Sequence, residues 1–398
     1  AEMMNSYGVI HNDPEVVSKI VASQAHHKKI DGHAPGLQGK DLDTYVAAGV
    51  YSDHECATME DALAKLQRGQ FIMIREGTAA RNLEALAPLL TPQYAERCMF
   101  CTDDKHPSDL LEKGHIDYIA REAINKYGVD PIIAVKAACH HASRYFLLNN
   151  RGAIAPGYLA DFAVIDNFKD FNVEMVFKKG VLYWNNGVLR DFEAPKIEEY
   201  LDKRAHDTFH VSTLTPDDFR DTRQRGVLGM VPGEIITTDN GYADHVDLEK
   251  DILKIAVVER HKGTHHIGLG YIQGYGLKSG AVATSISHDS HNIIVVGTNS
   301  ADMAFAANYI VEHHGGIVVV ENGTVKGSVV LEIAGIMSDR PLTEVNDQLE
   351  AAKDAAFTLG VSRGIDPFMT LSFMALPVIP KLRITTRGVV DVDTQQYV

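Results

Sequence analysis

The chain has 398 residues, 45% of them hydrophobic and 23% charged, which is enough apolar material for a folded core and for two or three domains. Its 53 acidic and 38 basic residues give a net charge of -15, and such a surface repels phosphate groups, which argues against a nucleic-acid partner. With 4 cysteines and no apolar run as long as a membrane span, the sequence predicts a cytoplasmic protein with no membrane partner and a small-molecule substrate.

Short apolar strands alternate with amphipathic helices over the first 150 residues. The pattern predicts strands over 29–32, 50–53, 70–74 and 97–102, and helices over 14–25, 40–48, 59–68, 116–126 and 131–143. The strand ends, at positions 33, 54, 74 and 103, are 20 to 29 residues apart. This spacing is typical of the βα units of a (β/α)8 barrel, so residues 1–150 are expected to form about half of one.

The rest of the chain divides at turn-rich and polar stretches. Residues 151–190 predict a small β portion, because alternating apolar residues follow a glycine- and proline-containing turn. Residues 191–247 are polar and are expected to be a connecting segment. Residues 248–398 predict an α/β domain, with strands over 252–258, 281–285, 293–296 and 317–320 and helices over 301–313 and 342–359.

Four residues with metal-binding side chains lie at the expected ends of different barrel strands: Glu2, His33, His54 and Asp103. Imidazole and carboxylate groups suit divalent cations, and a pair of such cations activates water for hydrolysis. A lone histidine is more often structural. Two histidines and an aspartate at strand ends one or two barrel units apart are harder to explain by packing, and they predict a metal site at the barrel's rim.

Several longer strings resemble one known family. The strings DGHAPGL at 31–37, SDHEC at 52–56 and FCTDDKHP at 100–107 resemble bacterial adenine deaminase, which belongs to the amidohydrolase superfamily. Further strings that resemble the family occupy 75–82, 152–158, 288–292 and 376–380. The resemblance runs from Glu2 to the C-terminus, and it implies an amidohydrolase barrel, a small β-domain and a C-terminal α/β domain of the adenine deaminase type.

The resemblance also implies an activity and a cofactor. Members of the family hydrolyse adenine to hypoxanthine and ammonia with a metal-activated hydroxide, in purine salvage. The implied cofactor is a pair of divalent metal ions, with Mn expected and Fe or Zn as alternatives.

The family's site residues can be carried over by position. Glu2 matches the carboxylate at the end of strand 4 that bridges two metals, His33 the strand-5 ligand and His54 the strand-6 ligand. Asp103 matches the strand-8 aspartate, which contacts metal and transfers the proton of the water. The adjacent Asp104 is an alternative for that catalytic role.

The resemblance leaves the role of Glu55 and of the substrate-binding residues open. Glu55 either protonates a ring nitrogen of the purine or orients His54. Arg75 and the loop residues His288, Asp289, His291 and Asn292 are expected to contact the purine. For the loop, the alternative is a turn in which Asp289 and Asn292 bind their own backbone.

One departure from the family concerns the first metal ligands, a His-x-His pair on strand 1, which this sequence lacks. Together with the unusual start at Ala1, this predicts that a preceding segment of the same protein holds strands 1 to 3, so that residues 1–150 supply strands 4 to 8. Half a barrel leaves open sheet edges, and a homo-oligomer is also expected.

Two other functions remain as alternatives: a different amidohydrolase reaction, such as cyclic amide hydrolysis, and a non-catalytic fragment that binds a purine or a partner chain. Cyclic amide hydrolases more often use a strand-4 lysine, where this chain has Glu2. The Cys98-x-x-Cys101 motif has no second pair and lies in an expected strand, which argues against zinc or redox chemistry there.

Overall fold

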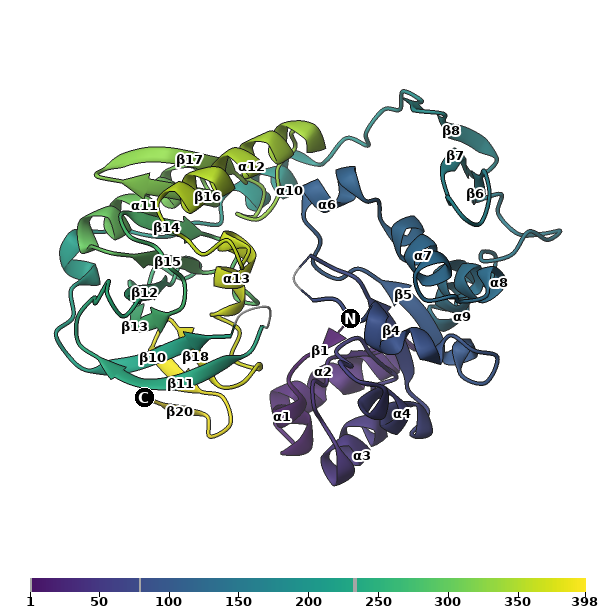
Figure 1. The fold of residues 1–398 in the computed structure, drawn as a ribbon, viewed down its shortest axis with the longest axis horizontal. Coiled ribbons are helices and arrows are strands. Elements are labelled where there is room, and N and C mark those ends of the chain that lie inside the picture. Colours follow the sequence, from purple (N-terminus) through teal and green to yellow (C-terminus); the bar gives the residue numbers. More distant parts are fainter. Residues whose placement is uncertain (1, 79, 232–234) are drawn as a thin grey trace. The chain divides into compact units, whose positions relative to one another are not determined.

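The computed structural model describes residues 2–78, 80–231 and 235–398, so Ala79 of the string at 75–82 and positions 232–234 of the expected connecting segment lie outside it. The chain divides into two compact units, Ala1–Ala194 and Pro195–Val398, and each is described by itself (Figure 1). Among the described residues, no helix combines the length and the apolar character that crossing a membrane requires.

Short parallel strands form the centre of the first unit. Strand β1 (Glu2–Met3) pairs with β2 (Asp31–Gly32), and β3 (Ser52–Asp53) pairs with β4 (Phe71–Arg75), which pairs in turn with β5 (Cys98–Cys101). All of these pairs are parallel, as expected for βα units. Each expected strand of this region is present, although the first two are shorter than the sequence pattern predicts.

Helices follow the strands of the first unit in chain order. They are α1 (Ser6–Ile10), α2 (Pro14–Ala25), α3 (Gly39–Ala47), α4 (Met59–Gln67), α5 (Leu83–Leu86), α6 (Pro107–Glu112), α7 (Ile116–Asn125), α8 (Pro131–Val135) and α9 (His141–Tyr145). The expected helix 131–143 is therefore two α-helical pieces, joined by a π-helical turn at Lys136–His140. Short 3₁₀ turns at Ala87–Leu89 and Ala95–Arg97 precede β5.

Local capping explains where two of these helices begin. The Asp13 carboxylate accepts hydrogen bonds from the backbone of Glu15 and Val16, and Pro14 occupies the first turn of α2. The Thr58 hydroxyl accepts a hydrogen bond from the Asp61 backbone at the start of α4. Both N-caps are the residues that the sequence predicts, so these helix starts are set locally.

An antiparallel sheet of four strands ends the first unit. It contains β6 (Phe162–Ile165), β7 (Val173–Lys178), β8 (Val181–Asn185) and β9 (Val188–Leu189), in that order. This agrees with the antiparallel strands expected between positions 151 and 190.

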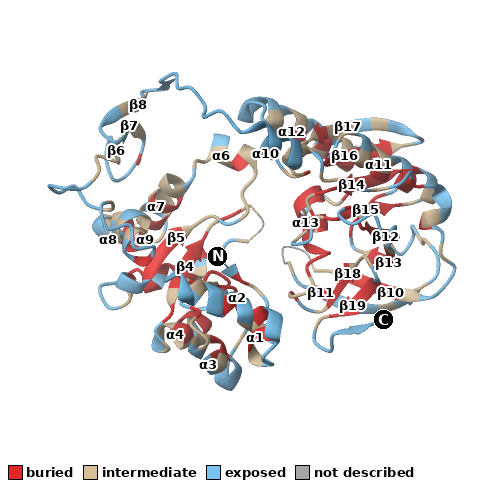
Figure 2. Ribbon diagram, turned by 180° about the vertical axis from the view of Figure 1, so that it is seen from behind, coloured by how far each residue is buried: buried red, intermediate tan, exposed pale blue. Residues whose placement is uncertain are grey.

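The second unit is built on an eight-stranded sheet in the order β11-β10-β13-β12-β15-β14-β16-β17. The strands are β10 (Arg225–Met230), β11 (Thr237–Ala243), β12 (Ile252–Val258), β13 (Ile267–Gln273), β14 (Ala281–Thr284), β15 (Ile293–Gly297), β16 (Gly316–Glu321) and β17 (Thr324–Val330). Figure 2 shows that β12, β14 and β15 are buried almost throughout.

The other elements of this unit are helices and a small second sheet. They are α10 (Glu199–His206), α11 (Ser300–Glu312), α12 (Leu342–Thr358), α13 (Pro367–Phe373), the 3₁₀ turn Pro216–Phe219, and the strands β18 (Leu382–Thr385), β19 (Gly388–Asp391) and β20 (Gln396–Tyr397). The four strands and two helices expected within 248–359 are all present, with bounds that differ by at most two residues.

The segment 191–247, expected to be a connection, contributes β10 and β11 to the main sheet. The sheet therefore starts well before residue 248. The sequence signal for β10 is weak because it contains Gly226 and Gly229. Packing demands both glycines: a Cβ on Gly226 would lie 3.0 Å from Val389 Cγ1, and one on Gly229 would lie 2.3 Å from Thr238 Oγ1.

Phe219 offers a test of how firmly this segment is integrated into the second unit. Its side chain is fully buried against residues of the main sheet, and its carbonyl accepts a hydrogen bond from Lys254 Nζ at 2.8 Å. We expect Phe219→Ala to lower the free energy of unfolding by about 3–5 kcal/mol, because it leaves a large cavity. Urea unfolding followed by circular dichroism measures this loss. Phe305→Ala, at a 40% exposed site on α11, is the control, and equal losses for both variants would contradict the assignment.

Candidate metal centre

The carboxylate of Glu2 reaches the site from the first strand of the chain. In the parallel pair of β1 and β2, Glu2 lies opposite Asp31 and Met3 lies opposite Gly32. The buried hydroxyl of Tyr45 reinforces this two-residue pairing, because it accepts a hydrogen bond from His33 N at 3.0 Å and donates to Met3 O at 2.5 Å. Tyr45 thereby fixes the strand that carries Glu2 against the strand that ends at His33.

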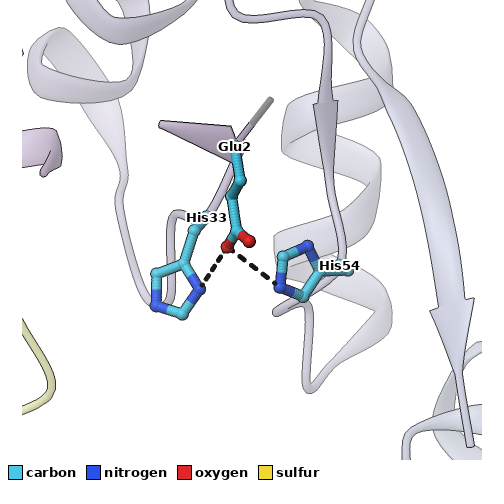
Figure 3. A group of neighbouring side chains, drawn as sticks. All are labelled: Glu2, His33 and His54. Atoms are coloured by element: carbon cyan, nitrogen blue, oxygen red, sulfur yellow. Dashed lines mark ion pairs between the residues drawn. The ribbon is translucent and has the colours of Figure 1, made fainter. Parts of the chain in front are cut away.

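His33 and His54 directly follow β2 and β3, and their rings face the same oxygen of Glu2. His33 Nδ1 lies 3.2 Å from Glu2 Oε1, and His54 Nε2 lies 3.4 Å from it (Figure 3). Both histidines are buried, whereas the side chain of Glu2 is 36% exposed. The structure thus brings together three of the four residues expected to bind metal.

The donor set fits a divalent cation. Two ligand atoms at about 2.1 Å from a tetrahedral ion are about 3.4 Å apart, which matches the spacing between the histidine nitrogens and Glu2 Oε1. Neither ring nitrogen of His33 has a hydrogen-bond partner among the described residues, although both are buried. Buried polar atoms are rarely left without a partner, so a cation that takes up one of these nitrogens is consistent with the geometry.

Glu55 also faces the two histidines. Its Oε1 lies 3.2 Å from His54 Nε2 and 3.4 Å from His33 Nδ1, which are the same two nitrogens that face Glu2. Glu55 therefore stands on the reacting side of His54 and contacts the same nitrogen, rather than supporting the ring through the other one.

Arg75, the last residue of β4, connects Glu55 with Asp103. Its Nη1 lies 2.5 Å from Glu55 Oε1 and 2.5 Å from Asp103 Oδ2, and its Nη2 donates to Glu55 Oε2 at 2.9 Å. The guanidinium is buried, and the side chain of Asp103 is 37% exposed. One buried cation thus holds two acids, of which Asp103 keeps access to solvent.

The charges of the cluster shift the pKa values of His54 and Glu55 in opposite directions. Burial alone would lower the pKa of His54, but the hydrogen bond and charge of Glu55, with the charges of Glu2 and Asp103, raise it to about 9. Burial would raise the pKa of the Glu55 carboxyl, yet the hydrogen bond from His54 and the positive charge of Arg75 hold it well below its usual range. Glu55 is therefore a carboxylate at neutral pH.

Asp103 and Asp104 follow β5 and differ in their surroundings. Asp103, which has a left-handed backbone with φ of 53°, is grouped with His54 and Glu55 as a set of potential metal ligands within 4.8 Å of one another. Asp104 belongs to none of the sets of metal-ligating side chains found among the described residues, and its carbonyl accepts a hydrogen bond from Thr78 N at 2.9 Å.

The four loop residues expected to contact the purine lie in the second unit. The His288 ring stacks on Phe373 with centroids 4.9 Å apart, and Asp289 is exposed. The Asn292 side chain is buried, and its Oδ1 accepts a hydrogen bond from Arg260 N at 3.1 Å. His291 N donates to Ser287 O at 2.6 Å. Within this unit, Asn292 joins the loop to Arg260 beyond the end of β12.

Sequence reasoning missed the residues that hold the strand ends together: Tyr45, Asp53 and Lys65. All three are fully buried and polar. Tyr45 and Lys65 lie on expected amphipathic helices, where they could be assigned to the polar face, and only the burial of Asp53 between two apolar strands could have drawn attention to it.

Comparison with known proteins agrees with this geometry. The amidohydrolase family matches residues 2–183, and the adenine deaminase C-terminal domain matches residues 234–396. Proteins named adenine deaminase from Desulfatibacillum aliphaticivorans and Nitratidesulfovibrio vulgaris strain DP4 are 45% and 43% identical to the chain, and each match covers 100% of the chain and 70% of the relative. One from Dehalococcoides mccartyi strain ATCC BAA-2266 is 44% identical over 98% of the chain and 69% of the relative. These matches confirm the resemblance seen in the sequence strings, and the chain belongs to the adenine deaminase family of the amidohydrolases.

Proposed function

We propose that this chain carries the strand-4 to strand-8 part of an adenine aminohydrolase site, which converts adenine and water into hypoxanthine and ammonia. The observation that carries the proposal is the approach of His33 Nδ1 and His54 Nε2 to a single oxygen of Glu2. Relatives that span the whole chain at more than 40% identity bear the name adenine deaminase, and this supports adenine as the substrate.

Glu2, His33 and His54 would hold a divalent cation, with Asp103 as a further ligand. When bound, the metal lowers the pKa of water and so supplies a nucleophile at neutral pH. Manganese is the proposed ion, with iron or zinc as alternatives, since imidazole and carboxylate ligands suit all three. Glu2 is the member of this set that can bridge two ions, because its carboxylate is partly exposed beyond the histidines.

Asp103 is the proposed proton acceptor. The oxygen of water forms a bond to the ring carbon that carries the amino group, and Asp103 takes the proton that water loses. The carbon–nitrogen bond then breaks, and the same proton goes to the departing nitrogen, which leaves as ammonia. Arg75 contacts Asp103 at 2.5 Å, keeps its carboxylate charged, and fixes its direction.

Glu55 has a place in this scheme that follows from its contacts. It faces the same nitrogens as Glu2 and is bound by Arg75 through both oxygens, so it stands beside the reacting atoms. We propose that Glu55 stabilises positive charge on the histidines and the purine during proton transfer. Protonation of a ring nitrogen by Glu55 itself would require a proton that its lowered pKa does not retain.

Several finer assignments are part of the same proposal. Strands β1 to β5 correspond to strands 4 to 8 of an amidohydrolase barrel, and a preceding segment of the protein would supply strands 1 to 3 with the His-x-His pair. The four-part division at 150, 190 and 247 separates the barrel, the small β portion, the connection and the C-terminal domain. Purine contact is proposed for Arg75 and for the loop 288–292, with each described contact of these residues as given above.

Replacing Asp103 tests the proton transfer. We expect Asp103→Asn to lower kcat at least 100-fold, because general-base catalysis contributes about 10²–10⁴ and the amide cannot accept the proton. Ammonia release from adenine by the Mn-supplemented protein measures the loss, and circular dichroism checks the fold. Asp104→Asn is the matched control and should cost less than 10-fold. A Asp103→Asn protein with near-normal turnover, or a larger loss in Asp104→Asn, would refute the assignment.

Metal removal tests the ligand set. A chelator should abolish ammonia release, and Mn²⁺ should restore it. His33→Ala should lower bound manganese, measured by elemental analysis after dialysis, because it removes one of three converging ligands. The control is His141→Ala: this histidine is buried in the same unit, but its Nδ1 donates to Cys98 O at 2.9 Å and not to the site. Equal metal content in both variants would count against His33 as a ligand.

A further inference from the structure

A fully buried lysine lies next to the candidate metal centre. Lys65, on α4, donates from Nζ to Ala34 O at 2.8 Å, to Asp53 Oδ2 at 3.0 Å and to Asp61 Oδ2 at 3.0 Å. All three donor positions of the ammonium group are used, and none of them reaches the ligands Glu2, His33 or His54 directly.

Asp53 binds the same segment from the other side. Its Oδ1 accepts a hydrogen bond from Ala34 N at 2.7 Å, and its Oδ2 accepts one from Glu55 N at 3.0 Å in addition to the one from Lys65. Cys56 Sγ lies 3.1 Å from the same oxygen. The N–H of Ala34 is therefore held by Asp53, and its carbonyl is held by Lys65.

The positions of these contacts in the chain give them a purpose. Ala34 directly follows His33, and Asp53 directly precedes His54. The two strands that end there are only two residues long, so few ladder hydrogen bonds fix them. The ion pair of Lys65 with Asp53 joins the residue after one candidate ligand to the residue before the other, and it determines how far apart the two imidazoles stand.

Asp53, Cys56 and Asp61 are close enough together to form a potential metal site of their own. The ammonium of Lys65 lies at 3.0 Å from both carboxylates and already neutralises them. A divalent cation at that point would have to displace a buried positive charge, so this group is a salt-bridge cluster.

We propose that Lys65 and Asp53 are positioning residues that set the separation of His33 and His54 and thereby the affinity of the site for its metal. This inference rests on the proposed function, because it assumes that the two histidines are ligands. A buried ion pair is often no more stabilising than well-packed apolar side chains, so stability alone does not account for this one. Groups that orient metal ligands typically change metal affinity about 10- to 100-fold when they are removed.

The test measures Mn²⁺ binding by the full chain, with the metal alone as the probe, in a calorimetric titration. The double variant Asp53→Asn/Lys65→Met removes both charges together and should bind Mn²⁺ at least 10-fold more weakly while unfolding cooperatively. The single variant Asp53→Asn leaves Lys65 paired with Asp61 and should be folded with an intermediate loss. Leu86→Ala, at a fully buried site of the same unit, lowers stability without touching the pair and should bind Mn²⁺ like the wild type.

Unchanged Mn²⁺ affinity in a folded Asp53→Asn or double variant would overturn the inference, as would an equal loss of affinity in Leu86→Ala. The proposed function would survive both results, since wild type would still bind Mn²⁺ and His33→Ala would still lose it. A wild-type chain that binds no Mn²⁺ would overturn both proposals.

Discussion

The candidate site depends on the parallel register of very short strands. Glu2 lies on β1, while His33 and His54 leave the carboxyl ends of β2 and β3, and parallel pairing brings such ends to one edge. Because side chains alternate between faces along a strand, a slip of one residue in the pair of β1 and β2 would turn Glu2 away from both rings. The closeness of three ligand atoms thus follows from backbone pairing and needs no element dedicated to the site.

The charge balance of the site follows from the same arrangement. Three carboxylates, those of Glu2, Glu55 and Asp103, gather around two histidines, and they would repel one another if nothing offset them. Arg75 ends the strand between those that lead to Glu55 and Asp103, so its guanidinium reaches both acids. Glu2 is left to the histidines. The strand order therefore separates the acids that a protein cation neutralises from the one that a metal ion would neutralise.

The sequence predicted the elements and the ligands better than it predicted what holds them in place. Helix starts at Asp13 and Thr58 and the ligands at strand ends could be identified because each is a local pattern. The strand β10 could not, since its glycines are required by close packing against Thr238 and Val389, which are distant in sequence. Lys65 was missed for a related reason: a lysine on an amphipathic helix is usually solvated, and its burial depends on partners 12 and 31 residues away.

The buried polar residues of the first unit share one property that explains this blind spot. Tyr45, Asp53 and Lys65 bind backbone groups of the strand ends, and none of them binds a candidate ligand side chain. A two-residue parallel pair has too few hydrogen bonds to define its own geometry, so side chains from neighbouring helices complete it. Such residues constrain where the ligands stand without taking part in the chemistry. The chemistry can be recognised from residue types at strand ends, but the distances between those ends are set by helices that carry no chemical signature.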